Sequence, residues 1–163
     1  MFDKFGEFDS AEEINRAAAA QMAEGDLNAV YAIAEENGID REDAQDYIDG
    51  ACLQLVNPLM AAYGKIDVES AELHMKGIMG DWVGYIKARC GEDRKTAEAV
   101  RKKGKSLKGC VAALLCWSFK NQQEIDPGIL RAAGVSGRVT LGIPDMRKAK
   151  QLITEYYLKE DQG

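Results

Sequence analysis

Proline, histidine and aromatic residues are scarce in this sequence of 163 residues. There are three prolines and one histidine, and aromatic side chains make up 7% of the chain. Because proline disrupts helix interiors and strands are enriched in aromatic residues, this composition favours helices over sheet. No apolar run approaches the roughly 20 residues that a membrane-spanning helix needs. The acidic first nine residues are unlike a secretory signal peptide, so we expect a cytoplasmic protein.

The four cysteines and the single histidine do not form a recognisable chemical site. Cys52, Cys90, Cys110 and Cys116 contain no C-x-x-C pair, and a chain of this length does not need disulfides to stabilise its core. With one histidine, His74, a four-ligand zinc site is poorly supported. No nucleophile motif surrounds that histidine. We therefore expect buried or half-buried free thiols, no metal, no cofactor and no enzymatic activity.

Gly104-Lys105-Ser106 invites comparison with the phosphate-binding loop of nucleotide hydrolases. The complete motif has a glycine five positions before its last glycine, where this chain has Ala99. The motif also follows a strand, whereas residues 96–103 have a helical pattern, so nucleotide hydrolysis is not expected. A weaker interpretation stays open: free amides at the start of the next helix, with lysines beside them, can hold a phosphate or a carboxylate.

Glycines and helix-capping residues divide the chain into helices. Ser10 and Glu13 have the spacing of a capping box, and Asn57-Pro58 has that of an N-cap followed by proline in the first turn. Apolar residues at helical spacing between such signals predict an all-α bundle of about eight short helices. We expect helices near residues 10–24, 26–37, 40–56, 58–64, 76–90, 93–103, 106–119, 126–134 and 145–159.

Several details of this pattern are specific enough to test. The apolar stripe of the third helix continues through Gly50, which predicts a single helix to about Val56 with a weak point at that glycine. Gly64 is expected to end a short helix, and a loop should follow over residues 65–74. Residues 107–119 are apolar nearly all round and should form the central core helix. Residues 137–144 are the one stretch with extended character.

Charge divides the chain into two halves. Residues 1–75 carry 17 acidic and 4 basic side chains, a net charge of −13, whereas residues 76–163 carry 10 acidic and 17 basic, a net charge of +7. Together they give the net charge of −6 for the whole chain. Such an asymmetry usually reports a partner or a mutual contact. We expect an acidic helical region (1–75) and a basic helical region (76–163), packed as one domain or as two small lobes.

Acidic residues are dense between residues 35 and 49. Their spacing fits no metal-binding loop, because Ala44 and Gln45 interrupt the alternation of acids that an EF-hand requires. A solvated face is one interpretation. The other is an array of carboxylates that resembles a run of phosphates and enters a basic nucleic-acid channel on a partner. The candidate partner-binding residues are Glu35, Glu36, Glu42, Asp46 and Asp49.

A basic run covers residues 94–108. Lysine and arginine at this density bind phosphates in a salt-dependent way without reading base sequence. The run contains no aromatic residue to stack on bases, and the pI of about 4.9 argues against simple nucleic-acid binding. A solvated face, a surface docked on the acidic half, and a contact with nucleic acid or an acidic partner all stay open. The candidates for that contact are Arg101, Lys102, Lys103, Lys105 and Lys108.

Two segments resemble the PcfK-like proteins of Gram-positive mobile genetic elements. The first runs from Tyr85-Ile-Lys-Ala-Arg-Cys-Gly-Glu-Asp through Ala97-Glu-Ala-Val to Lys105-Ser-Leu-Lys-Gly-Cys110. The second is the ending Tyr156-Tyr-Leu-Lys-Glu-Asp161. Members of the family share a helix, a short acidic turn, a second helix, and then Lys-Ser and a core helix with a cysteine. The resemblance covers residues 82–120 and 149–161, about half of the chain, and includes no catalytic motif.

One group of PcfK-like proteins consists of anti-CRISPR proteins, which inhibit the RNA-guided nuclease of type II-A systems. The resemblance therefore implies an inhibitor from a phage or another mobile element that binds this nuclease, or its guide complex, in the cytoplasm of the bacterial host. Such a nuclease holds its heteroduplex in a basic channel, where an acidic helix can compete. The alternative is an accessory protein of conjugative transfer that contacts DNA or a relaxase complex through the basic run. No membrane contact is expected, and the oligomeric state stays open.

Overall fold

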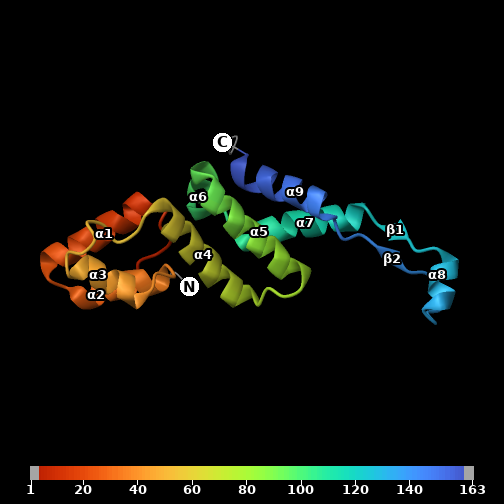
Figure 1. The fold of residues 1–163 in the computed structure, drawn as a ribbon, viewed down its shortest axis with the longest axis horizontal. Coiled ribbons are helices and arrows are strands. Elements are labelled where there is room, and N and C mark those ends of the chain that lie inside the picture. Colours follow the sequence, from red (N-terminus) through yellow and green to blue (C-terminus); the bar gives the residue numbers. More distant parts are fainter. Residues whose placement is uncertain (1–3, 160–163) are drawn as a thin grey trace.

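The computed structural model describes residues 4–159 and is mostly helical (Figure 1). Residues 1–3 of the acidic opening segment and residues 160 and 161 of the second resembling segment lie outside the described residues. Nine helices and one two-stranded sheet make up the described part, which confirms the all-α prediction. The elements are α1 (Ala11–Glu24), α2 (Leu27–Glu36), α3 (Arg41–Ile48), α4 (Pro58–Leu73), α5 (Ile78–Glu92), α6 (Arg94–Arg101), α7 (Leu107–Lys120), β1 (Gln123–Glu124), α8 (Pro127–Ala132), β2 (Thr140–Leu141) and α9 (Met146–Leu158).

Helices α1, α2 and α3 pack together at one end of the molecule (Figure 1). The Glu13 amide donates to Ser10 Oγ at 3.2 Å, and the Asp9 amide donates to Glu13 Oε2 at 2.7 Å. The start of α1 is therefore capped by both predicted side chains, although the glutamate reaches the amide one residue before the serine. Gly25 ends α1 in the left-handed conformation, with a φ of 75°.

Helix α3 is shorter than the sequence predicts. It ends at Ile48, and Gly50 has a φ of 82°, a left-handed conformation that cannot continue a right-handed helix. The prediction of a single helix to Val56 is therefore wrong, because the chain leaves the helix at the predicted weak point. Leu55 and Val56 are buried, but they reach the core from an irregular segment, and this is why the apolar pattern resembled a longer helix.

Helix α4 is longer than predicted. It begins after the predicted cap Asn57, but it continues through Gly64 to Leu73, so the predicted helix end at Gly64 and the loop over residues 65–74 are both wrong. Gly64 is a point of close approach between two helices. A Cβ atom at Gly64 would lie only 2.0 Å from the carbonyl oxygen of Asn37, the residue that ends α2. Glycine here lets α4 cross the end of α2.

Two hydrophobic clusters meet on α4. One cluster is formed by α1, α2, α3 and the segment before α4, together with Ala61. The other is formed by α5, α6, α7 and α9, together with Ala62 and Ile66. Ala61 and Ala62 are both fully buried, so this helix is a shared wall of the two clusters. The expected boundary between the acidic and the basic region, near residue 75, therefore lies just after α4. Helix α4 itself belongs to both hydrophobic clusters.

A hairpin arm, formed by β1, α8 and β2, projects from the second group of helices, which consists of α5, α6, α7 and α9 (Figure 1). Strand β1 pairs with β2 in antiparallel orientation, with Gln123 opposite Leu141 and Glu124 opposite Thr140. Helix α8 lies between the two strands at the far end of the arm. Strand β2 lies within the extended segment predicted at residues 137–144, whereas the sequence pattern does not predict its partner β1.

Helix α7 differs from the enclosed core helix that its composition predicts. Leu107, Cys110 and Leu114 are buried, but Leu115 and Phe119 are 54% and 74% exposed. Only one face of α7 packs on the other helices, so its opposite apolar face reaches the surface. That prediction is therefore wrong in its burial, although the helix itself begins after Ser106 as expected.

Candidate macromolecule-binding surfaces

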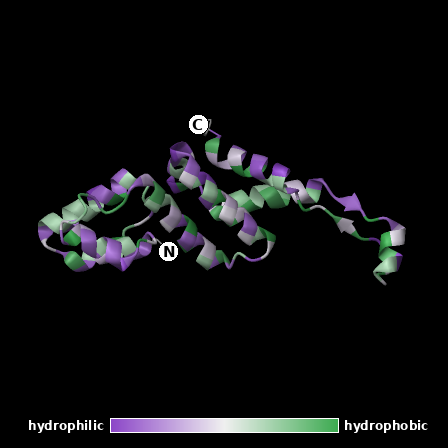
Figure 2. Ribbon diagram, in the orientation of Figure 1, coloured by the Kyte–Doolittle hydropathy of each residue, from purple (hydrophilic) through white to green (hydrophobic). Residues whose placement is uncertain are grey.

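The acidic candidates lie at the end of the molecule formed by α1, α2 and α3. Glu35 lies one residue before the C-terminal end of α2. Glu42, Asp46 and Asp49 lie on one face of α3 and its C-cap. All four are exposed. We call these four residues the acidic stripe. Figure 2 shows hydrophilic residues along the outer side of these helices.

Glu36, the fifth acidic candidate, has an internal role in the described structure. Its carboxylate accepts hydrogen bonds from the backbone amides of Lys4 at 2.6 Å and Phe5 at 3.2 Å, so it holds the N-terminal segment against α2. Within the described residues, the carboxylates of Glu35, Glu42 and Asp46 make neither a hydrogen bond nor an ion pair. Three of the four carboxylates in the acidic stripe are therefore not paired with a basic side chain among the described residues.

An exposed leucine lies close to the acidic stripe in the sequence, and sequence reasoning missed it. Leu53 is 100% exposed in the irregular segment that follows α3. It borders a shallow recess with Tyr47 of α3 and with Asn15 and Arg16 of α1. The predicted helix to Val56 hid this residue, because Leu53 lies off the apolar stripe of that helix. Only the break at Gly50 could have indicated an exposed loop here.

Arg101 is not part of an exposed basic surface. Its side chain is 1% exposed, Nη2 donates to Asn37 Oδ1 at 2.8 Å, and Nε donates to the Phe8 carbonyl oxygen at 3.2 Å. Burial lowers the pKa of this guanidinium to about 10, which still leaves it charged at neutral pH. The interpretation of Arg101 as a contact for nucleic acid is therefore corrected, because the side chain joins the two halves internally.

The remaining basic candidates separate into outward and inward lysines. Lys102, Lys103 and Lys108 are exposed, and none of their side chains forms an ion pair within the described residues. Lys105 is half-buried, and its Nζ donates to the Tyr156 carbonyl oxygen at 3.0 Å. We call Lys102, Lys103 and Lys108 the basic triplet.

A buried lysine determines the path of the backbone that carries the basic triplet. Lys65 on α4 is 0% exposed, and its Nζ donates to the carbonyl oxygens of Lys102 at 2.7 Å and Lys105 at 2.6 Å. The same Nζ lies 2.6 Å from Glu7 Oε1. An ammonium has three donors, and these three short contacts use them.

The start of α7 does not offer free amides to a phosphate. The Leu107 amide donates to Glu69 Oε2 at 2.9 Å, and the Gly109 amide donates to Ser106 Oγ at 3.0 Å. The Ser106 amide donates to the Tyr156 hydroxyl at 3.0 Å. Burial raises the pKa of Glu69, whose carboxyl takes the place that an external anion would need. The weaker interpretation therefore holds for a carboxylate of the chain itself, that of Glu69, which occupies the Leu107 amide that a phosphate would use.

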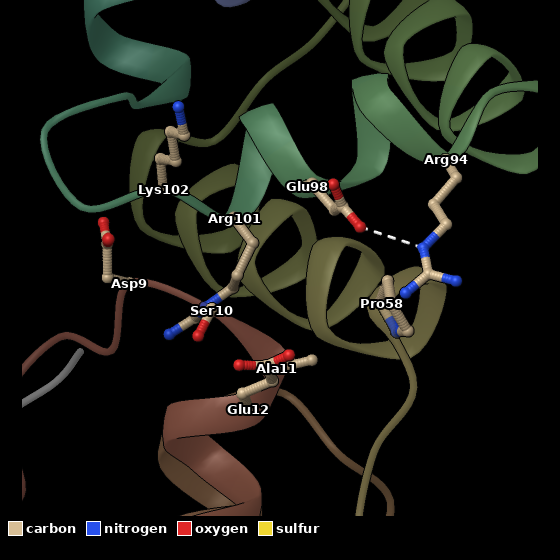
Figure 3. A pocket seen from close by; sticks show the side chains of 9 residues that line it. All are labelled: Asp9, Ser10, Ala11, Glu12, Pro58, Arg94, Glu98, Arg101 and Lys102. Carbon is tan, nitrogen blue, oxygen red and sulfur yellow. Dashed lines mark hydrogen bonds and ion pairs between the residues drawn. The ribbon is translucent and has the colours of Figure 1, made fainter.

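A cleft of about 300 Å³ marks the boundary between the acidic and basic halves (Figure 3). Asp9, Ser10 and Glu12 line it from the start of α1, and Arg94 and Lys102 line it from the side of α6. Asp9 Oδ1 accepts the Lys103 amide at 2.8 Å, and Arg94 Nε lies 2.9 Å from Glu98 Oε1. Arg94 and Glu98 thus neutralise each other within the cleft, whereas Asp9 binds a backbone amide.

Three further observations concern the described residues alone. In residues 4–159, no group of three or more histidine, cysteine, aspartate or glutamate side chains could hold a metal ion. Across the same part of the chain, no helix is long and apolar enough to cross a membrane. His74 is the C-cap of α4, with a φ of 51°.

Comparisons of the chain with known protein families, with curated proteins and with solved structures gave no match.

Proposed function

We propose that this protein is an anti-CRISPR-like inhibitor that binds the type II-A RNA-guided nuclease and blocks DNA engagement or cleavage. The proposal depends mainly on one observation: Glu42, Asp46 and Asp49 are exposed along one stripe of α3. Such a nuclease holds nucleic acid in a positively charged channel, and a row of carboxylates can compete with phosphates there. The resemblance of residues 82–120 to PcfK-like proteins supports the same partner. The site of action is then the cytoplasm of the bacterial host.

Leu53 gives this binding surface an apolar anchor. Charge steers two proteins together and raises the association rate, whereas buried apolar contacts provide most of the affinity at the centre of an interface. A leucine that is 100% exposed, a few residues beyond the acidic stripe, can fill an apolar pocket on the partner. We therefore assign steering to the acidic stripe and anchoring to Leu53.

Binding to the purified nuclease, with and without guide RNA, tests the proposal. We expect the protein to form a complex with the nuclease, and to show no affinity for free DNA under the same conditions. Leu53→Asp should increase the dissociation rate, because it places a charge in the apolar contact. Leu73→Asp is the matched control, since Leu73 is 36% exposed on a different part of the surface. Absence of binding to several type II-A nucleases would refute the proposal.

The basic triplet supports a second candidate, an accessory protein of conjugative transfer that contacts DNA or a relaxase complex. Lys102, Lys103 and Lys108 are exposed without ion pairs in the described structure, as a phosphate-binding surface requires. In this case the protein alone should bind DNA, and affinity should fall steeply with salt. Reversing the three charges to glutamate should abolish binding. No detectable DNA binding by the unmodified protein at low salt would eliminate this candidate.

A further inference from the structure

An apolar groove lies on the second group of helices, far along the chain from the acidic stripe. It has a volume of about 380 Å³, and none of its lining residues is charged. We call it the apolar groove. The 12 lining residues come from α5, α7 and the base of the arm, and include Trp82, Leu115, Phe119, Gln122, Leu141 and Ile143.

The apolar groove is unusual because large apolar side chains remain exposed along it. Phe119 is 74% exposed, Ile143 is 62% exposed and Leu141 is 56% exposed. Single exposed apolar side chains are common, but a contiguous group around a concave surface marks an interaction site. The exposed face of α7, which the sequence alone predicted to be buried, forms one wall of it.

The arm ends in a second group of exposed apolar side chains. We call residues 127–135 the arm tip. Ile129 is 61% exposed and Val135 is 45% exposed, and α8 has no buried residue. A helix of six residues is far below the roughly 12–15 that isolated helices need in water, and a lone two-stranded hairpin is marginal as well. The arm tip therefore lacks, within one chain, the packing that would stabilise it.

We propose that a second copy of this chain fills the apolar groove with its arm tip, so that two chains exchange arms around a two-fold axis. The arm starts at the rim of its own groove, because Gln122 and Leu141 both line it, and it extends away from the helices (Figure 1). An arm tip cannot fold back into the groove at its own base. It can reach the groove of another copy, whose arm tip then reaches the first groove.

The size of the two surfaces fits this arrangement. A stable interface uses about 20–30 residues on each side. The apolar groove has 12 lining residues, and the arm tip contributes the nine residues from 127 to 135. Either surface alone has fewer residues than a stable interface needs. In an exchanged dimer each chain uses both its groove and its tip, so about 20 residues of each chain take part in the interface. The uncharged lining also matches the exposed Ile129 and Val135 of the tip, whereas Arg131 is the one charged residue in it.

This inference is independent of the proposed function. The acidic stripe belongs to the opposite end of the molecule and stays exposed in the exchanged dimer (Figure 1). A dimer presents two acidic stripes, so each dimer could occupy two nuclease molecules. Failure of nuclease binding would leave the dimer unaffected, and a monomer could still inhibit.

Sedimentation equilibrium of the full chain tests the exchange. We expect a mass of twice 17.9 kDa at micromolar concentrations. Phe119→Glu in the apolar groove and Ile129→Glu in the arm tip should each give a monomer. Leu27→Glu should remain dimeric, since Leu27 is 42% exposed on α2, outside both surfaces. Circular dichroism verifies that each variant is folded, and Leu115→Gln replaces Phe119→Glu if the latter unfolds.

Mixing the two monomeric variants gives the most specific result. The Phe119→Glu chain keeps an intact tip and the Ile129→Glu chain keeps an intact groove, so a mixture can form one of the two tip–groove contacts. Because that contact is half of the exchanged interface, we expect the mixture to associate only at concentrations well above those that the unmodified dimer needs, and neither variant to associate alone. A monomeric unmodified protein would overturn the proposal. A dimeric Ile129→Glu variant would overturn it as well, because the two copies would then meet without the arm tip.

Discussion

Lys65 Nζ lies 2.6 Å from Glu7 Oε1, although the lysine side chain is fully buried in the middle of α4. The same ammonium binds the carbonyl oxygens of Lys102 and Lys105. One buried charge thus connects the N-terminal segment with the backbone of the basic triplet. Without Lys65, a carboxylate and two carbonyl oxygens would lose their donor at the junction of the two hydrophobic clusters.

Replacing Lys65 should destabilise the protein strongly. Lys65→Met keeps the apolar stem but removes the ammonium that binds the Glu7 carboxylate and two carbonyl oxygens. Removal of one partner from a buried ion pair costs about 3–5 kcal/mol. Lys87→Met is the matched control, because Lys87 pairs with Asp67 at the surface and such pairs contribute at most about 1 kcal/mol. Urea denaturation measures both. Equal unfolding midpoints for the two variants would contradict the internal role of Lys65.

Two glycines inside helices should respond to alanine in opposite directions. Gly64→Ala would place a Cβ 2.0 Å from the Asn37 carbonyl oxygen, so we expect a loss of about 3 kcal/mol or more as the helices separate. A Cβ at Gly84 on α5 meets nothing within 4 Å. Gly84→Ala should therefore stabilise the protein by about 0.5–1 kcal/mol through helix propensity alone. Thermal melting compares the stabilities of the two variants. A Gly64→Ala variant as stable as the unmodified protein would exclude the close approach of Gly64 to Asn37.

The contrast between these glycines explains which parts of the fold the sequence could predict. Helix starts at Ser10 and Asn57 follow from local chemistry, because a cap involves side chains and amides only a few residues apart. Gly64 and Gly50 look alike in the sequence, yet one lies inside α4 and the other beyond the end of α3. What separates them is a contact with Asn37, 27 positions away from Gly64, which no local pattern contains.

The sequence also predicts some members of the candidate surfaces and not others. Exposure of Glu42, Asp46 and Asp49 follows from helical spacing on an amphipathic helix. The burial of Arg101 does not, because it depends on Asn37 and Phe8 from the other half of the chain. A dense run of positive charge in a sequence therefore does not reveal which of its members point inward.

Adjacent tyrosines on α9 should respond differently to loss of their hydroxyl groups. Tyr156 accepts the Ser106 amide at 3.0 Å, so Tyr156→Phe should cost about 1 kcal/mol by leaving that donor unpaired. Tyr157 is 3% exposed, and its hydroxyl has no hydrogen-bond partner among the described residues. Burial raises its pKa, and Tyr157→Phe should be neutral or stabilising by about 1 kcal/mol. Denaturation curves with the reverse order would contradict these assignments.

The four thiols should react in two classes. Cys52 and Cys116 are exposed, whereas Cys90 and Cys110 are buried. Burial raises the pKa of Cys90 to about 11 and that of Cys110 to about 12, which removes the reactive thiolate near neutral pH. A thiol reagent at pH 8 should therefore modify two cysteines quickly in the native protein and all four in denaturant. Mass spectrometry identifies the sites, and rapid labelling of Cys110 in the native state would contradict the packing of α7.

The proposed inhibitor should be steered to the nuclease by three members of the acidic stripe on α3 and its C-cap. Neutralising Glu42, Asp46 and Asp49 to the corresponding amides should slow association, and the effect should be greatest at low ionic strength, where screening is weakest. Glu24, Asp81 and Glu155 provide the matched control, because amides there remove the same charge from exposed positions elsewhere. If the two sets of substitutions have equal effects, only net charge matters and the stripe has no special role.

Target cleavage by purified type II-A nucleases, titrated with this protein, is the most direct measurement. We predict that cleavage falls in proportion to added protein, stops near one binding site per nuclease, and shows no turnover. The acidic-stripe variant should require more protein for the same inhibition at low salt, and the control variant should not. Full cleavage by several such nucleases in the presence of excess protein would contradict the account.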